Sequence, residues 1–428
     1  MGEARLSEED LRWLVELMAI PTVSPLEGGA PEGVRKAQEV FLAGAAARGF
    51  TAERLDAPRW FDVRRGGAPR PVLEAIDQRS LDEQPSAVAV MGRPQPERRR
   101  LLVNFHIDTV GPHVPPRIEG RRLSGRGAVD DKGPGVAAAV GIAAAFRERP
   151  EIAEHLQVRL CSVPGEEGGA MGVFGTRHLI ATGERGRLMV FAEPTRGRVL
   201  DACTASMTAA VTVDGADSTD DHPGRGHNAT LALAHLARHL GRPLAALAQE
   251  TGLKVCVAGV HTGTAHNRVF GTGRLLINIA YHDAAAAARA ERLIAMSMAS
   301  AKTAFAAEWA GLGVAEPLIE DWDRIVALDW HKRGLPALSN RDAEMEELLR
   351  RSGLPRHDGL ADGTAFTCDA IWASALDGYA LACGPGDLDA NGAHTPGEHV
   401  DLGDLDHYAE RVRRLVLEFA THVRRQEP

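Results

Sequence analysis

The sequence predicts an α/β protein with a mixed, mostly parallel sheet flanked by helices, and a smaller α+β unit inserted into it. Between residues 101 and 195, apolar runs of strand character alternate with helical stretches, the pattern of a sheet covered on both faces. Polar residues directly follow these runs, where open α/β sheets carry their chemistry. The 428 residues, 44% of them hydrophobic, can bury a large core and favour two or three domains.

The composition limits the partners that the chain can have. Forty-nine basic residues against 58 acidic ones give a formal charge of −9, which argues against a nucleic-acid or anionic membrane partner. The first 20 residues lack a secretion pattern, and no apolar run reaches the ~20 residues of a membrane span. The five cysteines have no CxxC spacing, so we expect them to be reduced. These features predict a cytoplasmic protein.

Most elements of the first 200 residues can be predicted in chain order. Ser7 with Asp10 makes a capping box for a helix that ends before Pro21, and a second helix covers about 32–49. The segment 70–100, rich in Pro, Arg and Glu around a short apolar stretch, is expected to be an exposed hairpin or loop. An apolar stretch at 135–146 predicts a helix between strands. The strands are expected at 101–105, 156–163 and 188–192.

A different pattern begins near residue 200. It predicts a strand, a helix, two strands, a long Ala-rich helix and a further strand, which together suggest an α+β insertion with an open sheet. Their expected ranges are 207–214, 229–240, 254–261, 274–281, 284–309 and 325–330. A helix at 342–351, a strand at 379–383 and a helix at 405–423 then complete the main domain. The predicted domains are therefore 1–199 and 334–428 for the main domain and 200–333 for the insertion.

Acidic and His residues stand in five clusters along the main domain. These are His106 and Asp108 in HIDTV, Asp130 in GRGAVDDKG, Glu166 and Glu167 in PGEEGG, Glu193 in AEPT, and His394 in GAHTP. Two Zn²⁺ ions that share a bridging carboxylate each need one further carboxylate and one His. The sequence supplies two His (His106 and His394), two single carboxylates (Glu167 and Glu193) and one candidate bridge (Asp130). The sequence thus predicts a two-metal hydrolase site.

Two acidic residues remain for other roles. Asp108 lies two positions from His106 on an extended strand, where its carboxylate can hold the far imidazole nitrogen. Glu166 adjoins a ligand without being needed as one, so it is the candidate general base. Taken singly, each cluster has an ordinary explanation, such as a buried His at 106 or a turn at Asp130. The glycines around Asp130 do not make a phosphate loop, because no GKS or GKT follows.

These motifs resemble those of the two-domain metalloaminoacylases and metallocarboxypeptidases, the family of acetylornithine deacetylase, succinyl-diaminopimelate desuccinylase and aminoacylase. HIDTV, GRGAVDDKG, PGEEGG, AEPT, PGRGHNA and GAHTPGEHV follow one another in the family's order. GTAHNR at 263–268 makes acetylornithine deacetylase the nearest match. The resemblance implies a zinc exopeptidase-like catalytic domain, a ferredoxin-like lid or dimerisation domain, and a homodimer. It also implies two Zn²⁺ per chain, replaceable by Co²⁺ or Mn²⁺, and a cis peptide after Asp130.

The departures from the family lie on the substrate side. Family members carry a lid-domain His four residues before the Pro of PxxGxNA, and Thr219 stands in its place, although His222 or His227 could substitute. The family's DxR strand ending is altered to Asn278-Ile279-Ala280, and its Lys-Gly to Thr204-Ala205. Arg268 can bind a substrate carboxylate or form a structural ion pair, and the resemblance favours binding. The candidate substrate-binding residues are Asn267, Arg268, Thr219 and His222.

The sequence therefore predicts a zinc-dependent amide hydrolase that removes an acyl group from a small N-acyl amino acid or peptide-like substrate. Two alternatives stay open. A dipeptidase, a carboxypeptidase or an amide-forming enzyme would use the same core with another pocket. A binding protein could keep the fold without turnover, although the intact Glu166 argues against it.

Overall fold

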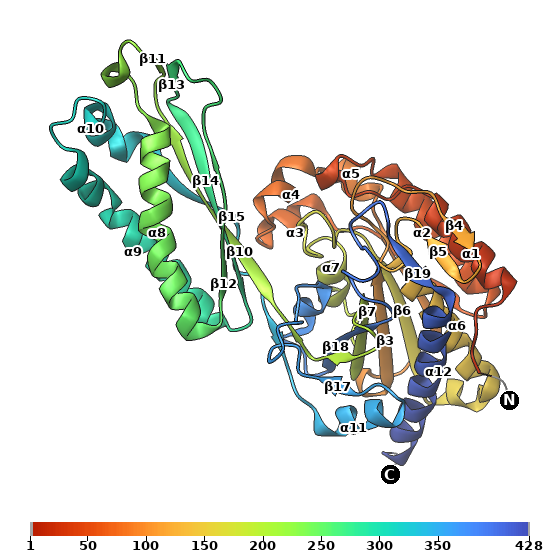
Figure 1. The fold of residues 1–428 in the computed structure, drawn as a ribbon. Helices are drawn as coiled ribbons and strands as arrows, with labels where there is room; N and C mark the ends of the chain where they lie inside the picture. The colour runs from red at the N-terminus through yellow and green to blue at the C-terminus, as the bar shows by residue number, and fades with distance from the viewer. Residues whose placement is uncertain (1–2, 427–428) are drawn as a thin grey trace. The chain divides into compact units, whose positions relative to one another are not determined.

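The computed structural model describes residues 3–426, and the chain folds as two compact units. One unit contains the residues up to Cys203 together with those from Leu338 onward, and the other contains Thr204–Ala337 (Figure 1). The larger unit thus combines two segments that are separated by more than 130 positions in the sequence.

An eight-stranded mixed sheet forms the centre of the larger unit. Its strand order is β1-β2-β6-β3-β7-β18-β8-β17. The four central strands β6, β3, β7 and β18 run parallel to one another, whereas β1 and β2 add to one edge in antiparallel fashion. The strands are β1 Thr51–Asp56, β2 Ser86–Met91, β3 Arg100–His106, β6 Gln157–Val163, β7 Leu188–Pro194, β8 Val199–Leu200, β17 Arg356–His357 and β18 Tyr379–Gly384. This is the mixed, mostly parallel sheet that the sequence predicts.

The central strands are buried on both faces, and alternate residues serve different layers. Leu101, Val103 and Phe105 of β3 belong to the large hydrophobic core. Five helices pack over this face, and α6 and α12 lie side by side on it (Figure 1). They are α1 Glu8–Ala19, α2 Glu32–Ala47, α6 Lys132–Glu148, α11 Ala343–Arg351 and α12 Leu402–Arg425. The expected capping box begins α1, since Ser7 and Asp10 each accept the other's backbone N–H.

The opposite face of the sheet carries α7 Thr176–Ala181 and the short helix η5 Asp369–Ala373. Asn104, which points away from the large core, donates to the Thr176 hydroxyl at 3.1 Å. A smaller apolar cluster on this side involves α3 Trp60–Arg65, α4 Arg70–Ala75 and the segment that precedes α7. The unit is completed by α5 Gln78–Asp82 and a three-stranded sheet of β4 Arg117–Glu119, β5 Arg122–Ser124 and β19 His399–Asp401.

The prediction of an exposed hairpin or loop for 70–100 is wrong. This segment contains two short helices and then β2, whose six residues are all buried between β1 and β6. The strand's partners come from 51–56 and 157–163, so its burial depends on pairing with segments that lie far away in the sequence. The Pro-, Arg- and Glu-rich composition belongs only to the flanks, which are largely exposed.

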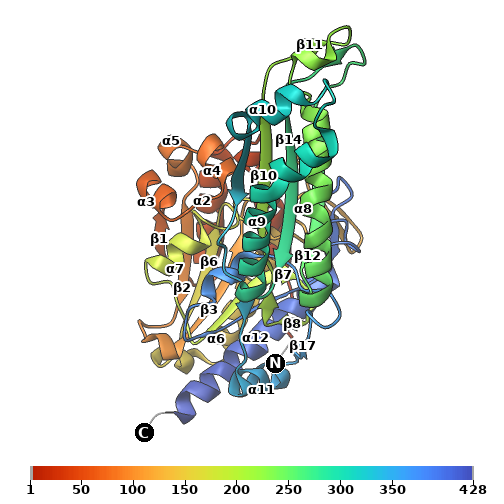
Figure 2. The same ribbon diagram turned by 90° about the vertical axis from the view of Figure 1, so that its left-hand side faces the viewer.

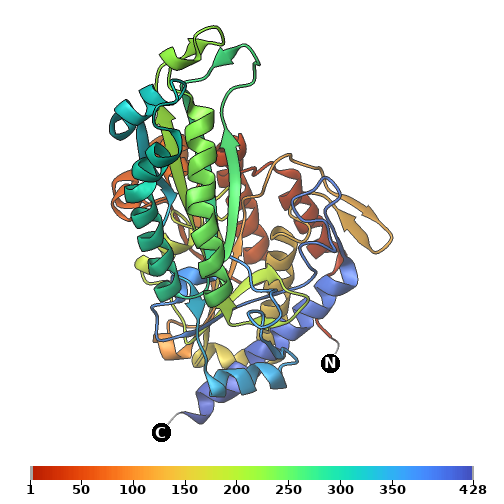
Figure 3. The ribbon, with the colours of Figure 1, turned by 60° about the vertical axis from the view of Figure 1, so that its left-hand side comes forward.

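The smaller unit has an antiparallel sheet in the order β12-β14-β10-β15. Along the chain it follows the expected sequence of strand, helix, strand, strand, helix and strand. The helices α8 and α9 lie side by side over one face of this sheet (Figures 2 and 3). The elements are β10 Ala205–Asp214, β11 Ser218–Thr219, α8 Ala229–Thr251, β12 Lys254–His261, β13 Arg268–Val269, β14 Thr272–Tyr281, α9 Ala284–Trp309, α10 Glu316–Ile325 and β15 Val326–Lys332. The sequence had not predicted α10.

The structure adds two facts about the chain's environment. Among the described residues, no helix combines the length and the apolar character that a membrane crossing needs. All five cysteines are free thiols, and only Cys256 is exposed.

A short two-stranded pairing of β9 Ala202–Cys203 with β16 Leu338–Ser339 joins the two segments of the larger unit.

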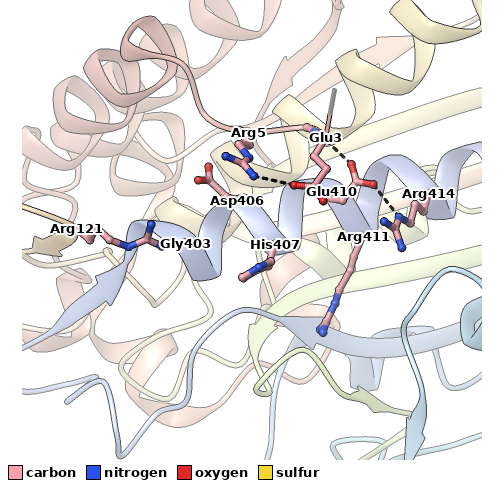
Figure 4. Close-up of a pocket in the computed structure, with 10 residues that line it drawn as sticks. Glu3, Arg5, Arg121, Gly403, Asp406, His407, Glu410, Arg411 and Arg414 are labelled. Atoms are coloured by element: carbon pink, nitrogen blue, oxygen red, sulfur yellow. Dashed lines mark hydrogen bonds and ion pairs between the residues drawn. The ribbon is translucent and has the colours of Figure 1, made fainter. Parts of the chain in front are cut away.

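Helix α12 is tied to the N-terminal segment by one glutamate. Glu410 accepts the backbone N–H of Ala4 at 2.9 Å and is paired with Arg413 and Arg414 one turn further on. It borders a charged cavity of about 280 Å³ (Figure 4). The hydrogen bond from Arg413 is the main reason why the pKa of Glu410 falls to about 2.

This lowered pKa predicts a pH-dependent stability. Because the folded carboxyl has the lower pKa, Glu410 stabilises the fold above its ordinary value of 4.5, and the contribution is lost as the pH falls toward 2. We expect Glu410→Gln to lower the free energy of unfolding by about 2 kcal/mol at pH 7, by roughly half as much at pH 3, and by little near pH 2. Urea unfolding across this range measures the effect. Glu418→Gln on the same helix, which removes only an exposed ion pair with Arg351, should change stability by less than about 1 kcal/mol.

Candidate metal centre

The predicted ligands lie at the carboxyl ends of neighbouring parallel strands. His106 is the last residue of β3, and Glu193 stands one residue before the end of β7. Glu166 and Glu167 follow β6 after Pro164 and Gly165. Since β6, β3 and β7 are adjacent and parallel, their ends meet at one edge of the sheet.

Two further ligands reach this edge from loops. Asp130 lies just before α6, and its peptide bond to Asp131 is cis, as the resemblance implied. His394 stands in the loop that follows β18, the parallel neighbour of β7, and adopts a left-handed backbone conformation with φ of 64°. Such a conformation is uncommon in a non-glycine residue.

The carboxylate of Asp130 occupies the middle of the cluster. One of its oxygens lies 2.8 Å from Nε2 of His106, and the other lies 3.0 Å from Nε2 of His394. Nε2 of His394 is also 3.2 Å from Oε1 of Glu167. Because each oxygen of Asp130 faces a different imidazole, the carboxylate has the orientation that a bridge between two cations needs.

The ligand atoms form three groups whose members lie within 4.8 Å of one another. The groups are His106 with Asp130 and Glu193, Asp130 with Glu167 and His394, and His106 with Glu166 and Glu167. The first two groups share Asp130, and each combines it with one His and one further carboxylate, as the predicted two-metal site requires. The third brings Glu166, the candidate base, close to both sets.

The electrostatics of the cluster favour bound cations. Burial raises the pKa of Glu166 and Glu193 well above the ordinary value, and it raises the pKa of Glu167 to about 7. Hydrogen bonds to Asp130 and Glu167 raise the pKa of His394 to about 10. These pKa shifts reflect the cost of burying carboxylates without compensating charge. Divalent cations would supply the same compensation, and the donor set of imidazole and carboxylate suits Zn²⁺.

His106 is oriented for this role by a hydrogen bond on its far side. Its Nδ1 lies 2.8 Å from the backbone oxygen of Asp108, which leaves Nε2 to face the cluster. The sequence had suggested that the Asp108 carboxylate would make this contact, but the nearest carboxylate oxygen is 3.9 Å away. The carboxylate instead accepts the backbone N–H groups of Glu166 and Glu167, at 3.3 and 3.1 Å. Asp108 thus fixes the loop that carries the base.

Glu398 is a supporting residue that the sequence analysis missed. Its Oε1 accepts the backbone N–H groups of Gly127, Val129 and Asp130 at 3.0 to 3.3 Å. Its other oxygen pairs with Arg126 at 2.6 Å, and both side chains are 1% exposed. Glu398 and Arg126 stand inside two of the quoted motifs, GAHTPGEHV and GRGAVDDKG, but a charged residue beside glycines gives no indication that it is buried.

The four substrate-side candidates belong to the smaller unit. Thr219 of β11 and Arg268 of β13 are directly paired, with Asn267 next in the chain, and the backbone N–H of His222 donates to the Thr219 carbonyl. Arg268 forms an ion pair with Asp217 and lies over the Phe270 ring. The four residues are therefore neighbours within this unit.

His227, the other possible substitute for the lid-domain His, is engaged locally. Its Nδ1 accepts the backbone N–H of Ala216 at 2.8 Å, and its Nε2 lies 3.0 Å from Asp321. Both ring nitrogens of His227 thus have partners within the smaller unit. His227 is buried, whereas His222 is exposed.

The larger unit thus combines a mixed, mostly parallel sheet with a buried cluster of candidate metal ligands at one edge. The chain belongs to peptidase family M20/M25/M40, whose profile matches residues 102–418. This span includes all the predicted metal ligands.

Two curated relatives are informative. Succinyl-diaminopimelate desuccinylase of Methylobacterium sp. (strain 4-46) is 30% identical over 292 residues, 62% of this chain and 65% of the relative. A putative LysW-lysine/LysW-ornithine hydrolase of Aeropyrum pernix is 28% identical over 179 residues, 42% of this chain and 46% of the relative. The matches thus span less than two thirds of each relative's length.

Solved structures share the fold over nearly the whole chain. An M20 family metallo-carboxypeptidase from Sulfolobus solfataricus has a TM-score of 0.66 at 13% identity, covering 97% of this chain and all of its own. Human carnosine dipeptidase 1 has a TM-score of 0.63 at 13% identity, with 97% of each chain covered. At such low identity these similarities establish the fold alone.

The ligand groups predict the effect of removing single side chains on metal content. We expect purified Zn²⁺-loaded protein to hold about two metal ions per chain, Glu193→Ala to retain about one, and Asp130→Ala to lose most of both. Glu398→Gln should weaken metal binding roughly 10- to 100-fold, because it frees the backbone that orients Asp130. Elemental analysis and competition with a chromophoric chelator measure these quantities. Full metal content in Asp130→Ala would contradict the bridging arrangement.

Proposed function

We propose that this protein is a dinuclear zinc hydrolase that cleaves the amide bond of small N-acyl amino acids. The position of Asp130 between two imidazoles, with Glu166 beside them, is the observation that carries the proposal. Family membership and a relative named as a desuccinylase support it.

The residues have distinct roles in this reaction. Two Zn²⁺ ions held by the ligand groups would polarise the amide carbonyl and lower the pKa of a bound water. Glu166 takes the proton from the attacking water and passes it to the nitrogen of the leaving amine. Burial first, and then the neighbouring Glu167, raise the pKa of Glu166. Asp108 keeps the Glu166 backbone in place through the hydrogen bond to its N–H.

The substrate side of the proposal rests on Asn267, Arg268, Thr219 and His222. A carboxylate of the substrate would have to replace Asp217 as the partner of Arg268, because these two side chains form an ion pair. This exchange is feasible since both side chains are about half exposed. A substrate with a free carboxylate, as every N-acyl amino acid has, meets the requirement.

A second candidate function uses the same metal centre to cleave a peptide bond. Dipeptides and peptides with a free carboxyl end present the same amide and the same carboxylate, and Thr219 in place of the lid-domain His alters the surroundings of the acyl group. Comparing kcat/KM for N-acetyl, N-succinyl and dipeptide substrates separates a deacylase from a peptidase.

Glu166→Gln tests the proposed catalytic base. The amide keeps the shape of the side chain but cannot take up the proton, so we expect kcat to fall about 10²- to 10⁴-fold while both metals stay bound. Hydrolysis of the substrate panel and elemental analysis are measured on the same preparation. Glu151→Gln, at an exposed glutamate of the same unit, should leave kcat unchanged. Activity close to wild type in Glu166→Gln would exclude this residue as the base.

We further propose that the protein is a cytoplasmic homodimer that pairs through the smaller unit. The five free thiols support the location. Strand β12 supports the dimer, because it lies at the edge of its sheet and exposes Val257 and Val260 by 45% and 43%. An exposed apolar edge strand of eight residues presents unpaired backbone groups, which favour pairing with another chain.

Val257→Lys tests this dimer. A buried, unpaired Lys would oppose association at the strand edge, so we expect the dimer dissociation constant to rise at least about 10-fold. Sedimentation velocity over a range of concentrations measures it. Thr212→Lys, in the inner strand β10 of the same sheet, would disturb the fold and is no control. Glu9→Ala on α1 of the larger unit, at a side chain that is 82% exposed, is the better control and should leave the dimer intact.

A further inference from the structure

The loop that carries Glu166 and Glu167 has an unfavourable backbone. Between β6 and α7, Gly165, Gly168, Gly169 and Gly172 all have positive φ, and so does Met171, with φ of 57°. Glycine loses the most conformational entropy when it is fixed, and a left-handed conformation is unfavourable for a non-glycine residue. Such a loop needs anchors in order to keep one conformation.

One anchor lies at the metal side of the loop. Asp108 accepts the N–H groups of Glu166 and Glu167, and the loop closes on itself when Met171 N–H donates to the Glu166 carbonyl at 3.2 Å. These bonds join the catalytic end of the loop to Met171, five positions further on. A group that fixes the position of Met171 therefore also restrains the peptide of Glu166.

A second anchor comes from a segment 200 residues further along the chain. Trp372, in η5, donates from its indole Nε1 to the carbonyl oxygen of Met171 at 2.7 Å. Its neighbour Asp369 accepts the hydroxyl of Thr176, the first residue of α7, and lies against Gly172 so closely that a Cβ there would be 2.1 Å from Oδ1. The helix η5 thus holds the far end of the loop from two sides.

The Trp372 side chain is itself well supported. Its ring packs against the small apolar cluster that includes Val63, Val72 and Phe174, and the guanidinium of Arg177 lies 5.1 Å from its centre. A donor held in this way has little freedom to follow a moving loop. Because Trp372 is already held by its packing, its hydrogen bond to Met171 limits the movement of the loop.

We propose that Trp372 is a positioning residue for the proposed hydrolysis: its hydrogen bond to Met171 keeps the loop of Glu166 and Glu167 in the conformation that places the base beside the metal ligands. The consequence for the reaction rests on the proposed function. Trp372 itself lies outside the ligand groups and acts only through the loop. A displacement of about 1 Å in a catalytic group can reduce turnover about 10²-fold, so a lost anchor has a measurable effect.

The test uses Trp372→Phe in the full-length, Zn²⁺-loaded protein. Phenylalanine keeps most of the ring packing and removes the N–H donor. Trp60→Phe is the matched control, because Trp60 packs against the same apolar cluster and, among the hydrogen bonds of the described residues, its indole has none. Three quantities are compared: amide hydrogen exchange in 165–173, the separate values of kcat and KM, and the thermal unfolding midpoint.

We expect exchange in 165–173 to rise about 10-fold in Trp372→Phe and kcat to fall about 10-fold, with KM within about twofold of wild type. Trp60→Phe should change neither exchange nor kcat. Equal exchange in Trp372→Phe and wild type would overturn the anchoring. Faster exchange with unchanged kcat in an active enzyme would overturn the positioning role.

The failure of the proposed function gives a different result. If the wild-type protein hydrolyses no amide of the panel, that function is wrong, while the exchange measurement still decides whether Trp372 anchors the loop. A fall in the unfolding midpoint of Trp372→Phe without faster local exchange shows a packing role only and also overturns the proposal.

Discussion

Asp130 places one carboxylate between two imidazoles, and most of the larger unit serves to hold it there. A buried carboxylate needs compensation by charge and by hydrogen bonds. Its side chain faces His106 and His394, while the backbone around it is held by Glu398, which is in turn paired with Arg126. Burial opposes ionisation of Asp130, but the hydrogen bonds to the two imidazoles outweigh it and keep the pKa below its ordinary value. The carboxylate is therefore ready to bridge cations.

The parallel sheet makes this arrangement possible. Four adjacent parallel strands end at one edge, so the loops that follow them bring their side chains to the same place although they are up to about 290 positions apart. Each loop is then fixed by a group from another part of the chain. Asp108 holds the loop after β6 from one side, and Trp372 holds it from the other. The geometry of the site thus depends on contacts between distant segments.

The sequence predicts much of this fold because apolar runs and their period reflect local physics. The strands at 101–105, 156–163 and 188–192 and the long helix at 284–309 appear close to their expected bounds, whereas the helix expected at 229–240 continues to Thr251. Strand β2 was missed because its burial depends on two distant partners, while its charged flanks suggest exposure. The contact between His106 and Asp108 was predicted for the Asp108 carboxylate, but the backbone oxygen of Asp108 makes it. Alternation along a strand places the two side chains on one side, but it does not show which polar group of Asp108 lies closest to the imidazole.

By itself, the sequence determined the types of the candidate metal ligands, their order and the kind of sheet that carries them, because these follow from residue chemistry and from patterns within a few positions. Only the tertiary structure decided which groups support the ligands. Glu398, Arg126, Asp369 and Trp372 are ordinary residues in their local sequence, and each gains its role from a partner that lies more than 190 positions away. The physical reason is that a buried charge or a strained loop is stable only when a matching group is brought to it, and the fold as a whole determines which group that is.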